Sequence, residues 1–136
     1  MPVCTPADRL QAKDLELPVS QPVLFASRDT LLLCTRTSLL RHAGFMTLRI
    51  QDLGVMVSMA RFRGFRTVVL DHTISANEQQ TIIRKLQECS ALFHIICVRS
   101  RQVPSQAIVR ECKACDKDDR RGGVHLLEDG LVLLGR

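Results

Sequence analysis

Residues 67–75 read TVVLDHTIS, a run of β-branched and aliphatic residues that ends at Asp71. Apolar residues at every position are typical of a strand buried on both faces, because a half-exposed strand alternates apolar and polar side chains. Ser75 and Glu78 then have the spacing of a capping box, the reciprocal pattern of hydrogen bonds that begins a helix. The stretch predicts a buried strand, a turn that holds a carboxylate, and a helix over residues 75–89.

Strands and helices alternate along the chain on both sides of this stretch. Toward the N-terminus, Asp29 is the expected N-cap of one helix and Gly44 is its expected stop. Listed in chain order, the expected strands are residues 22–27, 45–51, 65–73 and 93–100, and the expected helices are residues 28–44, 52–64 and 75–89. Strands that alternate with helices of about 12 residues predict right-handed crossovers and a parallel sheet covered on both faces. We therefore expect an α/β fold, a three-layer α/β/α sandwich.

The last third of the chain is less regular. One short helix is expected over residues 105–117, followed by a polar, charged loop. Residues 124–134, VHLLEDGLVLL, then predict two short apolar strands around a turn at residues 128–130. This C-terminal hairpin is expected in place of the helix that ordinarily closes a doubly wound domain.

Size and composition agree with one domain. The chain has 136 residues, of which 46% are hydrophobic and 24% charged, as is ordinary for one globular unit. Pro18 and Pro22 separate an N-terminal appendage, residues 1–21, from a single domain over residues 22–136. No run approaches the roughly 20 apolar residues that span a bilayer, and the first ten residues have no apolar run of the kind found in export signals. We expect a cytoplasmic protein without a membrane partner.

Charge and cysteine usage narrow the function classes further. The formal net charge is +5, but the basic residues are dispersed, and the chain has no Trp or Tyr on which bases could stack. We therefore do not expect nucleic acid as a partner. Cys34, Cys89 and Cys97 lie within apolar or helical runs, where a thiol is a small hydrophobe. They are interpreted as reduced thiols and not as members of a disulfide framework.

Polar side chains follow the predicted strands at their carboxyl ends. In open parallel α/β sheets this edge is where ligands and chemistry gather. The candidates there are Ser27, Arg28 and Asp29 after the first strand, Asp71 and His72 after the third, and Arg99, Ser100 and Arg101 after the fourth.

At these residues the chain resembles a response-regulator receiver domain, the phosphoryl-accepting module of two-component signalling. The resemblance covers residues 22–100 and is carried by the stretches PVLFASRD, LLRHAGF and TVVLDHTIS. Asp71 matches the aspartate that receivers phosphorylate. The resemblance implies a flavodoxin-like parallel sheet with strand order 2-1-3-4-5.

The departures from the receiver pattern fall on its chemistry. Receivers hold Mg²⁺ with an acidic pair after the first strand, where this chain has Ser27 and Arg28, and Asp29 comes one residue later. Arg99 stands where receivers have a hydroxyl residue, unless a shift of one residue places Ser100 there, and the family's lysine at the end of the fifth strand is missing. A carboxylate that attacks phosphorus needs a cation to reduce the repulsion between two anions. We therefore expect a degenerate receiver without Mg²⁺-dependent phosphorylation, with no metal and no cofactor.

Two interpretations of Asp71 remain open. An ionised carboxylate in a partly buried position is costly unless it is paired, so Arg28 or Arg99 is a candidate ion-pair partner. Alternatively, Asp71 caps the third helix or bonds the turn that follows it.

A second group of candidate residues lies near the C-terminus. Cys112 and Cys115 have the spacing of half a zinc site, but a second pair is missing, and adding His125 gives only three ligands. The four histidines show no pairing pattern in the sequence. We interpret the cysteines as two helix-borne thiols.

Three function classes follow. The first is a receiver-like signalling module that acts through protein–protein interaction, with a second copy of the chain as the expected partner in a homodimer. The second is an active receiver that uses Asp71 and Mg²⁺. The third is an anion- or nucleotide-binding domain built on Arg28, Arg99 and Arg101. No nucleophile and base form a recognisable pair, so an enzyme is not expected.

Overall fold

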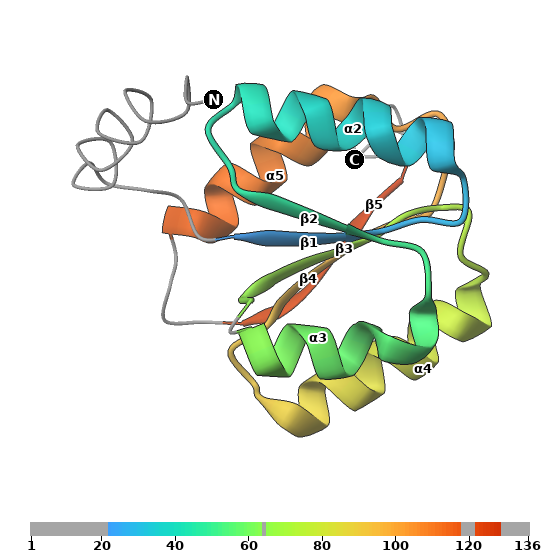
Figure 1. Cartoon of the computed structure of the whole chain (residues 1–136), viewed down its shortest axis with the longest axis vertical. Helices are drawn as coiled ribbons and strands as arrows, with labels where there is room; N and C mark the ends of the chain where they lie inside the picture. The colour runs from blue at the N-terminus through green and yellow to red at the C-terminus, as the bar shows by residue number, and fades with distance from the viewer. Residues whose placement is uncertain (1–21, 64, 118–121, 129–136) are drawn as a thin grey trace, which may run out of the picture.

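The computed structural model describes residues 22–63, 65–117 and 122–128, which form a five-stranded parallel sheet with helices on both faces (Figure 1). The strand order is β2-β1-β3-β4-β5. The predicted α/β class, the three layers and the flavodoxin-like order 2-1-3-4-5 are therefore confirmed. No helix among these residues is long and apolar enough to cross a membrane.

The elements fall within the ranges predicted from the sequence, except that β5 begins one residue before its predicted range. The strands are β1 (Val23–Ala26), β2 (Thr47–Ile50), β3 (Thr67–Leu70), β4 (His94–Val98) and β5 (Gly123–Leu127). The helices are α2 (Thr30–His42), the short 3-10 helix η1 (Leu53–Val55), α3 (Met56–Arg63), α4 (Ala76–Cys89) and α5 (Ser105–Lys117). The proposed appendage at residues 1–21 and the second arm of the expected hairpin lie outside the described residues.

The predicted helix ends are confirmed. The Asp29 carboxylate accepts a hydrogen bond from the Leu32 N–H at 3.0 Å and caps α2. Ser75 and Glu78 form the complete capping box of α4. Gly44 follows α2 with φ of +101°, a backbone conformation that glycine adopts without the clash of a side chain. Local hydrogen bonding therefore decides where these helices begin and end.

The core consists of two layers, one on each face of the sheet. Because successive side chains of a strand point to opposite faces, Leu70 packs against α3 and α4 while Val69 packs against α2 and α5. All four residues of β1 and of β3 are buried. The central strands are thus apolar on both sides, as the TVVL run predicts.

The crossover through α5 has the opposite hand to the other three. The chain moves from β3 to β4 with α4 on one face, and then moves in the same direction from β4 to β5 with α5 on the other face (Figure 1). About 98% of parallel crossovers are right-handed, which is why right-handed crossovers are expected throughout. That expectation is wrong for the connection from β4 to β5, because α5 lies on the other face of the sheet. The apolar side of α5, with Ile108 and Cys112, packs beside α2. That contact takes α5 away from the α4 face.

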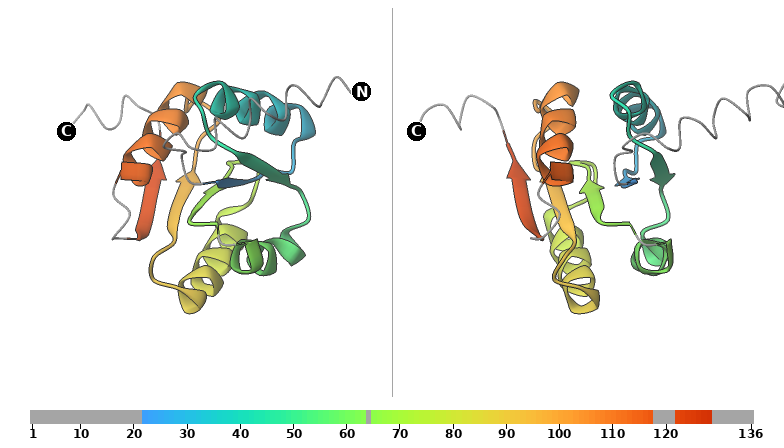
Figure 2. Two further views of the ribbon diagram at one scale, coloured as in Figure 1. Left: turned by 60° about the vertical axis from the view of Figure 1, so that its left-hand side comes forward. Right: turned by 90° about the vertical axis from the view of Figure 1, so that its left-hand side faces the viewer.

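This placement leaves one face of β5 thinly covered. Val124 and Leu126 point to the same face as α3 and α4, and they remain 39% and 48% exposed. β5 lies at one edge of the described sheet, and α5 lies beside it on the face that α2 also covers (Figure 2). An apolar strip is therefore open on the α4 side of β5.

Candidate functional site

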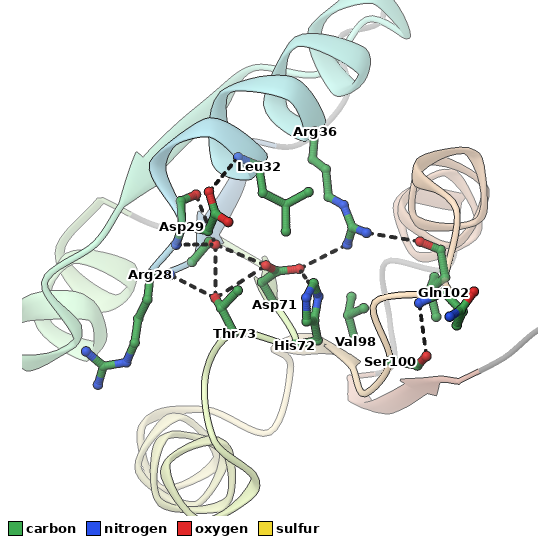
Figure 3. Close-up of polar contacts among 12 residues, drawn as sticks. Arg28, Asp29, Leu32, Arg36, Asp71, His72, Thr73, Val98, Ser100 and Gln102 are labelled. Carbon is green, nitrogen blue, oxygen red and sulfur yellow. Dashed lines mark hydrogen bonds and ion pairs between the residues drawn. The ribbon is translucent and has the colours of Figure 1, made fainter.

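The candidate site lies at the carboxyl ends of β1 and β3, which Ser27 and Asp71 follow in the chain. Figure 3 shows Asp71 at the centre of its polar contacts. Both residues continue the alternation of their strands on the α2 face, and both have no exposed surface. A carboxylate in such a position has lost its hydration and needs partners inside the protein.

The partners of Asp71 come from three parts of the chain, namely α2, the loop after β1 and the turn after β3. Its Oδ1 accepts a hydrogen bond from Nη1 of Arg36, at 3.0 Å, in an ion pair. Its Oδ2 accepts one from the Ser27 hydroxyl at 3.0 Å and lies 3.4 Å from the Thr73 hydroxyl. Both carboxylate oxygens are therefore engaged.

Arg36 connects the carboxylate to the start of the α5 connection. It projects from the middle of α2, is 5% exposed, and donates from Nη2 to the Val103 carbonyl at 3.0 Å. One guanidinium thus joins the end of β3 to the loop before α5. Removing either charge of a buried pair leaves the other uncompensated, so the stability of the site depends on both members.

The predicted ion-pair partners of Asp71 are wrong, and side-chain alternation explains why. Arg28 and Arg99 each lie one residue out of phase with Asp71 and point to the α4 face. Arg28 pairs there with Glu78, which holds the pKa of Glu78 below its usual value. Arg99 lies beside Cys97, whose thiol pKa is raised by burial, an effect that the Arg99 charge opposes.

This geometry also weakens the anion-binding alternative. Arg28 is engaged with Glu78, Arg99 lies beside Cys97, and Arg101 is exposed. The three guanidinium groups therefore have different surroundings.

The hydroxyl groups of Ser27 and Thr73 connect the loop after β1 to the turn after β3. The Ser27 Oγ lies 3.1 Å from the Thr73 Oγ1 and accepts from the Asp29 N–H at 3.1 Å. Thr73 in turn accepts from the Arg28 N–H at 2.9 Å. The loop after β1 is therefore held against the turn after β3 by neutral hydrogen bonds, and Asp29 is committed to the helix cap.

The interpretation of Asp71 as a helix cap is wrong, because Ser75 caps α4. Bonding to the following turn is confirmed in part: the Ile74 N–H donates to the Asp71 carbonyl at 3.1 Å, and Thr73 contacts the carboxylate. His72 has Nδ1 3.4 Å from Oδ1 of Asp71 without hydrogen-bond geometry. Ser100 accepts from the Gln102 N–H at 3.0 Å and lies away from Asp71 in Figure 3.

Sequence reasoning missed Arg36, Thr73 and Gln79. Gln79 is 1% exposed, and its amide donates to the carbonyls of Asp71 and Val98 at 2.9 and 3.3 Å. A signal was available, because Arg36 and Gln79 occupy positions of helical spacing within the apolar stripes of α2 and α4. A polar residue on the buried stripe of a helix indicates an internal partner.

Two residues of the second candidate group, Cys115 and His125, also meet, and His94 joins them. Cys115 Sγ lies 3.7 Å from His125 Nε2, and His94 Nδ1 lies 3.5 Å from the same nitrogen. The expectation that the histidines have no pairing pattern is therefore wrong for His94 and His125. Cys112 faces the core beside α2, and burial raises the pKa of its thiol.

Comparison with known proteins supports the fold. The sequence matches no family model and none of the curated proteins. A protein from Burkholderia pseudomallei described as pilus assembly-related matches in structure with a TM-score of 0.53 and 17% identity, over 80% of this chain and 78% of that one. A pilus assembly protein, CpaE, from Burkholderia thailandensis matches with a TM-score of 0.48 and 19% identity, over 79% and 84%. The first likeness agrees with the flavodoxin-like arrangement described above.

Proposed function

We propose that this chain is a receiver-like regulatory module in which Asp71 is a structural anchor and not a phosphoacceptor, and that the module acts by binding another protein. The observation that carries the proposal is the buried ion pair between Asp71 and Arg36, whose side chains are 0% and 5% exposed.

The ion pair opposes phosphorylation for two reasons. An oxygen of Asp71 would have to reach a phosphodonor in solution, but both oxygens are buried and bonded. Arg36 already supplies the positive charge that Mg²⁺ supplies in a receiver, and withdrawing it would leave a buried charge unpaired, at a cost of about 3–5 kcal/mol. The site is thus held in one state without a phosphoryl group.

The apolar strip on β5 supports the protein-binding half of the proposal. Val124 and Leu126 are exposed on an edge strand of the described sheet, and exposed apolar edges favour pairing with another chain. A second copy is the partner that fits best, because two identical edge strands can pair about a two-fold axis. We therefore propose a homodimer through β5.

A phosphorylation assay tests the anchor role. The purified protein is incubated with Mg²⁺ and acetyl phosphate, or with Mg²⁺ and beryllofluoride, beside an active receiver as a positive control. We expect no added phosphate in the intact mass and no shift of the Thr73 amide signal. A phosphate adduct mapped to Asp71 by peptide mass spectrometry would overturn the proposal.

A further inference from the structure

We propose that His94, Cys115 and His125 bind one transition-metal ion, with Zn²⁺ the best match, on the α5 face of β4 and β5. This site is separate from the one around Asp71 and does not depend on the regulatory function proposed above. It uses three residues that are distant in the sequence and come from three elements.

The fold brings the three side chains to one point. In the register of β4 and β5, His94 is opposite Gly123 and His125 is opposite Ile96. The two histidines therefore lie diagonally on adjacent strands and point to the same face, the face that α5 covers. Cys115 approaches from α5. His94 and Cys115 are each 3% exposed, and the His125 side chain is 32% exposed, so the cluster is shielded on one side and open on the other.

The distances between the ligand atoms agree with tetrahedral coordination. Zn–N bonds of about 2.0–2.1 Å and Zn–S bonds of about 2.3 Å at tetrahedral angles require about 3.3 Å between two nitrogens and about 3.6 Å between nitrogen and sulfur. The observed separations are 3.5 Å for His94 Nδ1 to His125 Nε2 and 3.7 Å for Cys115 Sγ to His125 Nε2. All three ligand atoms lie within 4.8 Å of one another. Small side-chain adjustments are enough to close the site around an ion.

A carboxylate orients the central ligand. Glu111 Oε2 lies 3.0 Å from His125 Nδ1. When Nδ1 carries the proton, its N–H donates a hydrogen bond to this carboxylate. The lone pair of Nε2 then points toward Cys115 and His94. A carboxylate that accepts from the second nitrogen of a metal-bound histidine is the usual outer partner of zinc ligands. Glu111 precedes Cys115 by one helical turn, so α5 supplies both the thiolate and the orienting group.

The donor set selects the class of metal. One thiolate and two imidazoles suit Zn²⁺, with Co²⁺ as its spectroscopic substitute, and do not suit the oxygen-seeking ions Mg²⁺ and Ca²⁺. Three protein ligands leave the fourth position for water on the exposed side of His125. Cys112 lies one turn from Cys115 in the same buried layer, but it is not part of the cluster of converging ligand atoms.

Metal binding would stabilise the crossover from β4 through α5 to β5, the part of the fold with the unusual hand. The ion would connect α5 to β4 and β5, which are the three parts of the crossover of opposite hand. Because such a site exists only in the folded chain, binding stabilises the protein in proportion to the logarithm of the metal concentration over the dissociation constant. We expect a higher melting temperature with Zn²⁺ than after treatment with a chelator.

A cobalt titration of the full chain, reduced and freed of metal, tests the site. We expect one Co²⁺ per chain, visible d–d bands of a tetrahedral ion, and a thiolate-to-cobalt band in the near ultraviolet, all displaced by Zn²⁺. C115S should remove the thiolate band, and H125Q should weaken binding at least 100-fold. E111Q should weaken binding by about 10–100-fold, because it removes only the orienting carboxylate.

The matched controls are C89S, which removes an exposed thiol, and H42Q, which removes an exposed histidine. Both should bind Co²⁺ as the unchanged chain does. Circular dichroism and urea unfolding without metal show whether each variant folds. If C115S does not fold, then C115A and H125Q replace it. A missing thiolate band in the unchanged chain, or a band that persists in a folded C115S and disappears in C89S, would overturn the proposal.

Discussion

At the scale of single residues, the candidate site is defined by the contacts of one buried carboxylate, that of Asp71. Asp71 is buried, and Arg36, Ser27 and Thr73 surround its carboxylate with a closed set of hydrogen bonds. A buried ion pair gives little net stability compared with apolar residues of the same size, whereas breaking it by removing one member is costly. The pair therefore affects stability chiefly when one of its two members is removed.

Replacement of Asp71 tests the pair. We expect Asp71→Asn to lower the free energy of unfolding by about 3–5 kcal/mol, because Arg36 is left charged, buried and unpaired. The combined change Asp71→Leu with Arg36→Met should recover much of this loss. Urea unfolding followed by circular dichroism measures both. Arg28→Ala is the control, and its urea midpoint should stay unchanged because the Arg28–Glu78 pair is exposed. An unchanged midpoint for Asp71→Asn would refute the anchor role.

Thiol reactivity reports burial at the same scale. Cys97 and Cys112 are buried, and burial raises the pKa of both thiols, so little thiolate is available at neutral pH. Cys89 is exposed. Treatment with iodoacetamide at neutral pH should modify Cys89 while Cys97 and Cys112 stay unmodified until urea is added. Peptide mass spectrometry measures the three sites, and rapid native labelling of Cys97 or Cys112 would contradict this prediction.

At the scale of elements, β5 and its crossover are the most unusual part of the molecule. The strand is held by its ladder with β4, by α5 on one face, and by a close approach of the chain at Gly122. A Cβ atom at Gly122 would lie 2.1 Å from the Ala91 carbonyl oxygen and 2.6 Å from that of Phe93. Only glycine allows this backbone contact, which lies directly before β5.

Gly122→Ala tests this contact. We expect it to destabilise the protein by about 1–3 kcal/mol, the range for overpacking, since the atoms it would strike belong to the backbone. Hydrogen exchange should rise first at the amides of Gly123–Leu127. Gly54→Ala is the control, because its added Cβ meets only the flexible Asp52 carboxylate, at 3.2 Å. Equal effects of the two substitutions on exchange in β5 would show that the contact at Gly122 is unimportant.

At the scale of the whole molecule, the position of α5 decides which surface is open. A helix on the α4 face would have covered Val124 and Leu126, but α5 packs beside α2 instead. The exposed strip follows from this choice of face, and it is the surface through which we propose that two chains pair.

Self-association tests this surface. Leu126→Lys places a charge in the proposed contact, where it would lose its hydration, so we expect the dimer dissociation constant to rise at least tenfold. Leu31→Lys is the control, because Leu31 is 76% exposed on α2 and far from β5 in the chain. Sedimentation velocity over a range of concentrations measures the change. A monomer at every concentration, or equal weakening by both variants, would remove β5 from consideration as the interface.

Much of this structure is encoded locally. The run TVVLDHTIS predicts a strand buried on both faces, and Ser75, Glu78, Asp29 and Gly44 predict where helices begin and end, because a cap needs only neighbours within a few residues. The alternation of these elements predicts the parallel sheet. The same run places Asp71 directly after a buried strand, where the structure has it.

Side-chain direction at the strand ends required the tertiary structure. A strand that is apolar at every position carries no record of which residues face which layer, so the sequence could not show that Asp71 turns toward α2 while Arg28 and Arg99 turn toward α4. The same lack of local information applies to the face that α5 covers, and hence to the meeting of His94, Cys115 and His125. These outcomes depend on packing between residues far apart in the chain, and only the folded molecule brings those residues together.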